Sequence, residues 1–351
     1  AFTADIDTLA PYYIINFDDS GSPEAVTSGG NGSFQTYIQL KNYETKNSNT
    51  IIQKLILAFK ELEKIFKNDF LDIEFAVDSK NEIYIFQVRP MVVWNKENYY
   101  KLDLKEALYK VERKIEKLSS VHPNLLGGKA IFGIMPDWNP AEIIGAKPKR
   151  LSLSLYKEFI TDNIWAYQRD NYGYRNLRSH PLLISFLGVP YIDVRVDFNS
   201  FIPKKLNEET SKKLAEYYLD KLSNFPAYHD KVEFKIVHSC YYFNLEEKLN
   251  DLTSNGFKNK EIEEIKISLL DITNKIIDPN FGHFKKDIEK IHQLTDYKDK
   301  IVNSKLSRID KIYWLTEYCK RYGTLPFAGI ARAAFISTQI LRSILELGII
   351  N

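Results

Sequence analysis

The sequence has little cysteine and no excess of either charge, and these absences exclude several classes of protein. Two cysteines, Cys240 and Cys319, cannot form a disulfide framework in 351 residues, and no Cys/His spacing resembles a zinc site. The 48 basic and 46 acidic residues give a net charge of +2, which provides no general attraction to nucleic acid or to anionic membranes. No uninterrupted apolar stretch of membrane-spanning length is present. We expect a cytoplasmic protein with reduced thiols.

The composition that remains is that of a globular protein large enough for two domains. Hydrophobic residues make up 44% of the chain and charged residues 27%, and a length of 351 residues corresponds to about two domains. We place a first domain at 1–95, a linker helix at 96–120 and a mainly α-helical second domain at 121–351. The helical spacing of apolar residues predicts helices at 51–67, 104–118, 156–172 and 323–343, the last one buried between domains.

Residues 70–91 are the most informative stretch of the chain. Two runs rich in β-branched and aromatic residues flank the polar segment Ser79–Glu82, which predicts a β-hairpin with a four-residue loop. Because side chains alternate along a strand, this loop gives the cross-strand pairs 78 with 83, 76 with 85, Glu74 with Gln87, and Asp72 with Arg89. The opposite face is expected to join the core through Ile73, Phe75, Val77, Tyr84, Phe86 and Val88.

A carboxylate, an amide and a guanidinium group side by side on a sheet suit a magnesium-bound polyphosphate. Glu74 can bind the cation through oxygen, and Arg89 can donate two parallel hydrogen bonds to phosphate oxygens while Asp72 holds it in place. The alternative interpretation is a solvent-exposed hairpin face with one ordinary cross-strand ion pair. Such pairs are common and contribute little to stability.

The run Asp72-Ile-Glu-Phe-Ala-Val-Asp78, followed by Ile83-Tyr-Ile-Phe-Gln-Val-Arg-Pro90, resembles the end of the ATP-grasp (PEP/pyruvate-binding) domain of phosphoenolpyruvate synthases and pyruvate phosphate dikinases. The resemblance implies that Glu74, Gln87 and Arg89 contact ATP and that Glu74 and Gln87 bind Mg²⁺. It also implies an α+β fold, in which the C-terminal part of an ATP-grasp domain, an antiparallel sheet plus helices, precedes a mainly helical acceptor-binding domain. In that family a first ATP-grasp half precedes this part, so we expect the chain to be a fragment of a longer polypeptide.

In the resembling enzymes, a histidine on a swivelling domain carries the phosphoryl group from ATP to the acceptor. None of the six histidines lies in the Gly- and Ser/Thr-rich context of such a domain. The phosphohistidine is therefore expected outside this chain, and no catalytic residue is assigned within it. About 260 residues follow Arg89-Pro90 without the strand–helix alternation of a pyruvate barrel. This domain order resembles that of rifampin phosphotransferase-like enzymes and of the L-glutamine kinases of capsular phosphoramidate biosynthesis. The stretches Met135–Glu142 and Pro190–Arg195 are more similar to the second group.

Polar residues for an acceptor occur at two places in the second domain. Asn139 followed by Pro140 predicts a helix start, and the alternation within 190–199 predicts a strand with one polar face. The candidate acceptor residues are Asp137, Asn139, Glu142, Asp193 and Arg195. An arginine and an acid match the carboxylate and ammonium of a free amino acid. A charged, solvent-exposed edge strand is the alternative for 190–199.

A third polar segment, residues 229–238, predicts another strand. Glu233 within it is a weaker site candidate, and its two histidines are interpreted as structural. For the chain as a whole, the resemblance implies part of an ATP-dependent kinase, with the amide nitrogen of L-glutamine as the expected acceptor. Its expected partners are ATP, the acceptor and the rest of the same polypeptide, without nucleic acid or membrane. A phosphoenolpyruvate synthase-like or rifampin phosphotransferase-like enzyme and a non-catalytic ATP-grasp scaffold are the alternatives.

Overall fold

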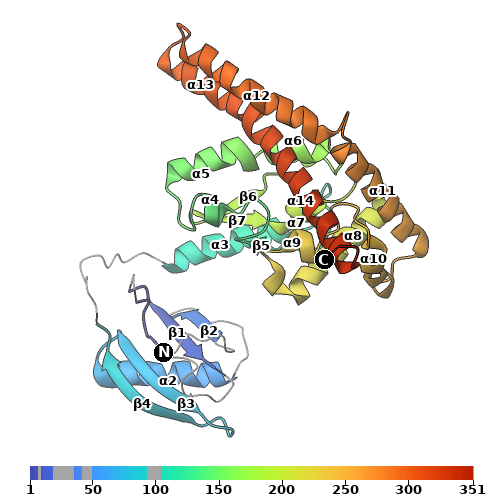
Figure 1. Ribbon diagram of the computed structural model, residues 1–351. Helices are drawn as coiled ribbons and strands as arrows, with labels where there is room; N and C mark the ends of the chain where they lie inside the picture. The colour runs from blue at the N-terminus through green and yellow to red at the C-terminus, as the bar shows by residue number, and fades with distance from the viewer. Residues whose placement is uncertain (7–8, 19–34, 42–49, 93–103, 351) are drawn as a thin grey trace. The chain divides into compact units, whose positions relative to one another are not determined.

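The computed structural model describes residues 1–6, 9–18, 35–41, 50–92 and 104–350. The chain divides into two compact units, Ala1–Lys110 and Val111–Asn351. In its described part the first unit is a small antiparallel β structure with one complete helix and the beginning of a second, and the second unit is largely helical (Figure 1). The fold is therefore mixed α+β, as predicted. Residues 96–103 of the segment that we assigned to a linker lie outside the described residues.

An antiparallel sheet with a helix packed on one face forms the first unit. Its elements are β1 (Tyr12–Phe17), β2 (Gln35–Leu40), α2 (Thr50–Phe66), β3 (Leu71–Val77) and β4 (Ile83–Pro90). The pairs β1–β2 and β3–β4 are each antiparallel. Residues 1–3 join them, because Phe2 exchanges two backbone hydrogen bonds with Ile14 of β1 while the amide of Thr3 donates to the carbonyl of Leu71 in β3.

The core of the first unit lies between α2 and the sheet. Its fully buried members are Tyr13, Ile15, Ile52, Leu55, Ile56, Phe59, Leu71 and Ile73. The four that come from α2 have the i, i+3, i+4, i+7 spacing of one helix face, so the helix predicted at 51–67 is confirmed. This packing fixes which face of the β3–β4 hairpin is buried and which remains available.

The β3–β4 hairpin is confirmed, but its register near the tip differs from the prediction. The pairs closest to the loop are Phe75–Ile85, Ala76–Tyr84 and Val77–Ile83. An irregularity between Glu74 and Phe75 leaves Phe86 as one additional residue on β4, which is the geometry of a β-bulge. Beyond the bulge, Glu74 pairs with Gln87 and Asp72 with Arg89, as predicted.

The bulge also changes which side chains of β4 face the helix. Tyr84 and Phe86, both predicted to be in the core, are 51% and 70% exposed, whereas Ile83 and Val88 pack against the core. The prediction was wrong because side chains alternate with a period of two, so that one additional residue reverses the alternation on one side of the bulge.

The loop of this hairpin is one residue longer than predicted and runs from Asp78 to Glu82. The backbone amides of Lys80 and Glu82 both donate to Oδ1 of Asp78, each at 2.9 Å. These hydrogen bonds, that of Glu82 foremost, hold the pKa of Asp78 below its usual range. Asn81 has a φ of 62°, a left-handed conformation that asparagine adopts more readily than most residues. The longer loop and the bulge offset each other, which is why the polar pairs keep their predicted register.

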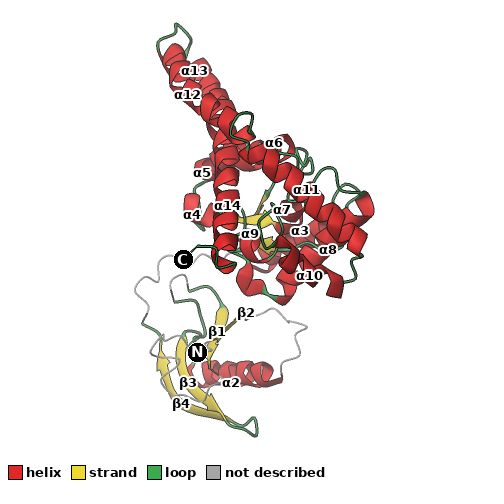
Figure 2. Ribbon diagram, turned by 45° about the vertical axis from the view of Figure 1, so that its right-hand side comes forward, coloured by secondary structure: helices red, strands yellow, loops and turns green. Residues whose placement is uncertain are grey.

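Helices dominate the second unit, which also contains a small sheet (Figure 2). The sheet order is β5 (Phe132–Gly133), β7 (Val189–Asp193), β6 (Leu183–Phe186), and both pairs are antiparallel. The helices are α3 (Leu104–Ser119), which begins in the first unit, α4 (Pro140–Ile143), α5 (Arg150–Tyr156), α6 (Ile164–Asn171), α7 (Val194–Asn199), α8 (Glu208–Asn224), α9 (Val232–Lys235), α10 (Leu245–Ser254), α11 (Asn259–Ile277), α12 (His283–Val302), α13 (Arg308–Tyr318) and α14 (Leu325–Glu346). Short 3₁₀ and π segments are η2 (Lys157–Thr161), η3 (Pro226–Tyr228) and η4 (Cys319–Thr324).

Helix α7 lies at the centre of the second unit. Val194 and Phe198 of α7 belong to the main core, which α8, α10 and α11 surround. Val196 belongs to a second cluster, in which Trp165 of α6 and Ile192 of β7 are fully buried. The short helix therefore joins the sheet to the helical part, and its polar side chains are carried into the interior.

Several elements of the second unit differ from the sequence predictions. The strand predicted at 190–199 ends at Asp193, whose Oδ1 accepts a hydrogen bond from the amide of Val196 at 3.2 Å and so caps α7. This N-cap favours a helix after Asp193 in place of the strand that the alternation of polar and apolar residues suggested. The strand predicted at 229–238 is instead a turn followed by α9, and the helix predicted at 156–172 is divided into α5, η2 and α6. The predicted helices at 104–118 and 323–343 are confirmed as α3 and α14, and Asn139 caps α4.

Helices α13, η4 and α14 follow one another as a single helical stretch, Arg308–Glu346. By length and composition alone this stretch could cross a membrane. Its α14 part packs against α12, α6 and α11 of the second unit, and it carries a buried arginine, Arg332, that pairs with Glu233. Of its most apolar window 28% is buried, and large apolar side chains such as Ile309, Ile312 and Phe327 are exposed.

Gly329 is where α14 approaches its neighbours most closely. A Cβ at this position would lie 2.0 Å from Oδ2 of Asp287 and 2.3 Å from the hydroxyl of Tyr172, two groups that hydrogen-bond to each other at 2.7 Å.

We expect Gly329→Ala to lower the free energy of unfolding by about 1–3 kcal/mol through overpacking. Gly323→Ala is the matched control, because its Cβ would meet nothing closer than 3.4 Å and should stabilise the helix by about 0.5–1 kcal/mol. Urea denaturation measures the free energy of unfolding of both variants. Equal changes in the two variants would contradict the close packing of α14 at Gly329.

Candidate functional site

The exposed face of the β3–β4 hairpin brings the predicted nucleotide-binding residues together. Nε of Arg89 donates to Oδ2 of Asp72 at 2.7 Å, and its Nη2 lies 3.8 Å from Oε1 of Glu74. Gln87 is the direct cross-strand partner of Glu74. The side chains of Arg89 and Glu74 are 58% and 57% exposed, so both can reach a ligand on this face. The hydrogen bond to Asp72 raises the pKa of Arg89, which therefore keeps its positive charge.

The donor set on this face fits a magnesium ion that is bound together with a nucleotide. Mg²⁺ takes oxygen ligands, commonly one or two carboxylates together with substrate phosphates and water. Glu74 offers a carboxylate and Gln87, opposite it, an amide oxygen, whereas Asp72 is engaged by Arg89. Among the described residues no group of three or more His, Cys, Asp and Glu side chains could hold a metal by itself. An ion here would thus depend on phosphate oxygens.

A cavity of the second unit collects three of the five predicted acceptor residues. It has a volume of about 400 Å³ and lies between α4, α6, α9 and α14. Asp137, Asn139 and Glu142 line it, and we call it the polar pocket. The other charged lining residues are Arg169, Asp230, Lys231, Glu233 and Arg332. Glu233, the weaker sequence candidate, is thus brought to the same place as the first three.

Two buried ion pairs form part of the wall of the polar pocket. Oδ2 of Asp137 lies 2.6 Å from Nη2 of Arg169. Glu233 accepts hydrogen bonds from both terminal nitrogens of Arg332, the Nη2–Oε1 distance being 2.6 Å. Both guanidinium groups lie over the ring of Phe201, at 4.5 and 5.1 Å from its centroid. Buried charges of this kind require such partners, because an unpaired one would be strongly destabilising.

Asp197 of α7 lies fully buried near these pairs, and neither of its carboxylate oxygens has a hydrogen-bond partner among the described residues. Burial, and then the charge of Asp137, raise the pKa of Asp197 well above its usual range, against the opposing charge of Arg169. Folding therefore makes this carboxyl harder to ionise than an exposed aspartate.

Trp138 shapes the edge of the polar pocket through a backbone conformation that is rare for its residue type. Its φ is 59°, its carbonyl accepts a hydrogen bond from the hydroxyl of Tyr156, and its ring lies 6.3 Å from that of Phe327. Left-handed conformations of bulky residues are strained and occur preferentially where a ligand is held. Trp138 thus places an aromatic wall beside the acids of the pocket.

The structure does not bring Asp193 and Arg195 to the polar pocket. Arg195 donates from Nη2 to the carbonyl of Leu118 at 2.7 Å and from Nη1 to that of Ser120 at 3.0 Å, and it thereby closes the carboxyl end of α3. Asp193 caps α7, and both side chains are buried. They were grouped with the other candidates because a strand face was expected where the chain turns into a helix.

Sequence reasoning missed the functional potential of Arg169, Asp197 and Arg332. One signal was available for Arg332, since a charged residue within an otherwise apolar helix needs a buried partner. No such signal existed for Asp197, which was placed on a strand face with polar neighbours. Its position depends on α7 being a helix that turns this side chain inward.

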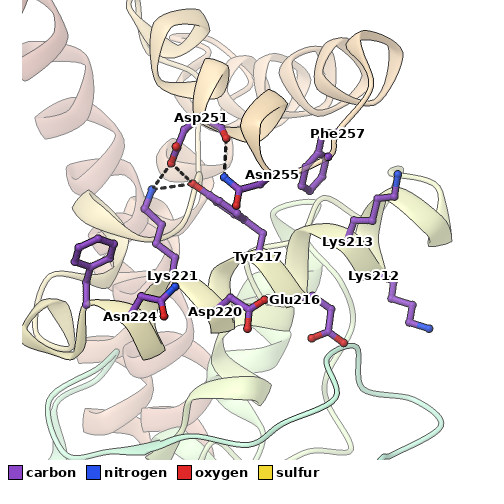
Figure 3. A pocket seen from close by; sticks show the side chains of 12 residues that line it. Lys212, Lys213, Glu216, Tyr217, Asp220, Lys221, Asn224, Asp251, Asn255 and Phe257 are labelled. Atoms are coloured by element: carbon purple, nitrogen blue, oxygen red, sulfur yellow. Dashed lines mark hydrogen bonds and ion pairs between the residues drawn. The ribbon is translucent and has the colours of Figure 1, made fainter.

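A second cavity of the same unit, of about 430 Å³, lies along α8 and α10 (Figure 3). Within it the hydroxyl of Tyr217 donates to Oδ2 of Asp251 at 2.5 Å, and Nζ of Lys221 lies 2.9 and 3.4 Å from the same two oxygens. These groups satisfy one another, and none of the candidate site residues lines the cavity. The polar pocket, by contrast, is lined by three of them, Asp137, Asn139 and Glu142.

Comparison with known families places the hairpin in a nucleotide-binding domain. Residues 26–107 match the family described as pyruvate phosphate dikinase, AMP/ATP-binding domain. Comparisons with curated proteins and with solved structures give no match. The matched range covers less than a third of the 351 residues and contains Glu74, Gln87 and Arg89. An ATP-binding domain of this type suggests an ATP-utilising, kinase-like phosphotransferase.

The raised pKa of Asp197 predicts that the stability of the protein depends on pH. A carboxyl whose pKa is raised on folding contributes stability that is fully present below its unfolded pKa of about 3.9 and is lost as the pH rises through the folded pKa. Asp197→Asn removes this loss, so we expect the variant to be the more stable protein at pH 8 and the difference to shrink towards pH 4. For each pH unit by which the folded pKa exceeds the unfolded pKa, the free energy of unfolding falls by about 1.4 kcal/mol.

Urea denaturation across this pH range measures the effect. Asp220→Asn is the control, because Asp220 is 63% exposed and pairs with Lys129 at the surface, and its pH profile should follow that of the unmodified protein. A loss of stability in Asp197→Asn at pH 8 would show that the charged carboxylate is the form the fold requires.

Proposed function

We propose that this chain is part of an ATP-dependent phosphotransferase that passes a phosphoryl group to a small acceptor through a phosphohistidine outside the described residues. The observation that carries the proposal is the convergence of Glu74, Gln87 and Arg89 on one exposed sheet face within the matched ATP-binding range. Phosphoryl transfer requires mainly positioning and neutralisation of charge, and this face offers groups for both.

In the proposed nucleotide site, Asp72 fixes Arg89 through Nε, a hydrogen bond that does not use the two terminal nitrogens of the guanidinium group. These nitrogens would donate to phosphate oxygens. Glu74 and Gln87 would hold Mg²⁺, which, when bound, neutralises charge that develops on the transferring phosphoryl group. The weak approach of Arg89 to Glu74, at 3.8 Å, leaves the carboxylate of Glu74 available for this role.

The acceptor we propose is an α-amino acid, L-glutamine with its amide nitrogen as the phosphorylated atom. The polar pocket supports this class because it combines acids that could receive an ammonium, arginines that could receive a carboxylate, and aromatic walls. Of the candidate residues, Asp137, Asn139 and Glu142 belong to the proposal. Asp193 and Arg195 do not, because both are used within the fold.

The size and polarity of the pocket weigh against a large apolar acceptor such as rifampin. A volume of about 400 Å³ is at the lower end of the range for drug-sized ligands. The exposed charges of Glu142, Asp230 and Lys231 would lose hydration without gaining partners if an apolar ligand covered them. A small zwitterion would instead supply charges of both signs.

Arg89→Ala tests the nucleotide site. In the intact protein we expect a loss of ATP-dependent phosphoryl transfer of about 10²-fold or more, because one preorganised donor to the phosphates is removed. The fold should persist, since the side chain is 58% exposed. Phosphorus NMR follows ATP consumption, circular dichroism follows the fold, and Lys80→Ala in the exposed hairpin loop is the control. Unchanged AMP or ADP formation in Arg89→Ala would refute the assignment.

Glu142→Gln tests the acceptor pocket. The side chain is exposed at the rim, so the substitution removes a negative charge without leaving a buried group unpaired. We expect KM for the acceptor to rise about tenfold while KM for ATP is unchanged, the size of effect that a lost charge-assisted contact produces. A panel of glutamine, pyruvate, rifampin and sugars, followed by phosphorus NMR, identifies the acceptor.

The matched control for Glu142→Gln is Glu158→Gln, an exposed acid of the same unit that pairs with Lys320. Activity with pyruvate or rifampin and none with glutamine would reject the proposed acceptor while leaving the ATP-dependent reaction in place. An equal rise in KM in both variants would reject the polar pocket as the acceptor site.

A further inference from the structure

A third cavity of the second unit shares one wall residue with the polar pocket. It has a volume of about 220 Å³ and is lined from α12 by His283, Lys286, Asp287 and Lys290. These positions have the i, i+3, i+4, i+7 spacing of a single helix face. Gln168 of α6 lines both cavities. We call this cavity the α12 pocket.

We propose that the α12 pocket binds a phosphate group, as orthophosphate or as the phosphate of a small phosphomonoester. The charged groups that act on His283 are Lys275, Lys286, Lys290 and a single acid, Asp287. That acid is already engaged, because Oδ2 accepts from the hydroxyl of Tyr172 at 2.7 Å and Oδ1 from Nζ of Lys290 at 3.2 Å. The pocket therefore has a surplus of positive charge and of hydrogen-bond donors.

The side chain of Gln168 gives an independent indication of a ligand. It is only 2% exposed, its Oε1 accepts from Nη1 of Arg169 at 3.2 Å, and its Nε2 has no hydrogen-bond partner among the described residues. A buried amide N–H without an acceptor is costly. An oxygen of a phosphate group in the α12 pocket would accept this hydrogen bond.

The position of the pocket at the beginning of α12 adds to its affinity for anions. Helix α12 spans His283–Val302, and its N-cap Gly282 provides no side-chain hydrogen bond to the first turn. The positive end of a helix of this length favours phosphate and other anions. The volume is below the range that holds drug-sized molecules, which favours a phosphate or a small monoester over a nucleotide.

This inference does not depend on the proposed acceptor or on phosphoryl transfer, because binding can be measured without turnover. Titration calorimetry with orthophosphate, and separately with glycerol 3-phosphate, tests it on the full chain. We expect saturable binding of at least one of the two, and Lys286→Ala should weaken it about tenfold by removing a charge-assisted hydrogen bond. Lys286 is exposed, so this substitution should leave the fold intact.

Lys285→Ala is the matched control, because Lys285 lies on the same turn but its Nζ contacts the carbonyl of Pro279 at 3.4 Å. It should leave the affinity for phosphate unchanged. If only one of the two ligands binds, the result shows whether the site takes free phosphate or the phosphate of a monoester. The absence of saturable binding for both ligands, or an equal loss in the two variants, would overturn the proposal.

A proton NMR titration of His283 provides a second readout. Burial, and then the charge of Lys286, hold the pKa of His283 below its ordinary value. A phosphate group beside the ring favours the protonated imidazole, so phosphate should raise this pKa in the unmodified protein and in Lys285→Ala, but much less in Lys286→Ala. An unchanged pKa in the unmodified protein at saturating phosphate would also overturn the site.

Discussion

The buried pairing of Arg332 with Glu233 is the interaction on which the second unit depends. It ties the apolar helix α14 to the short helix α9, and the two side chains are 3% and 7% exposed. An arginine so far from water requires both of the hydrogen bonds that Glu233 provides. The same contact fixes one wall of the polar pocket, so the residues that hold the fold together also set the charge pattern that a ligand would meet.

The nucleotide face of the first unit could be predicted from the sequence because two irregularities offset each other. The alternation of side chains correctly paired Glu74 with Gln87 and Asp72 with Arg89. The same alternation gave the wrong pairs closer to the loop, because Phe86 is an additional residue there. A β-bulge cannot be recognised from the order of apolar and polar residues. The hydrogen bonds to the carboxylate of Asp78 set the loop length, whereas the alternation had placed Asp78 in the strand.

The polar pocket could be predicted only in part, since its walls come from segments far apart in the chain. Asp137, Asn139 and Glu142 were found through a local helix-start motif, whereas Arg169 and Arg332 reach the pocket only through tertiary packing. Arg195 illustrates the opposite error, a polar residue that suggested a ligand site and instead holds the end of α3. Charged residues in a core have structural and functional uses that sequence alone does not separate.

The ring of Phe201 lies against the guanidinium groups of both Arg169 and Arg332. This contact limits which amino-acid substitutions position 201 can accept. The electron-rich faces of an aromatic ring attract cations, and an aliphatic side chain of similar size would fill the space without offsetting the repulsion between two neighbouring positive charges. A phenylalanine that carries no charge and does not line the polar pocket thereby becomes part of the electrostatic support of the pocket wall.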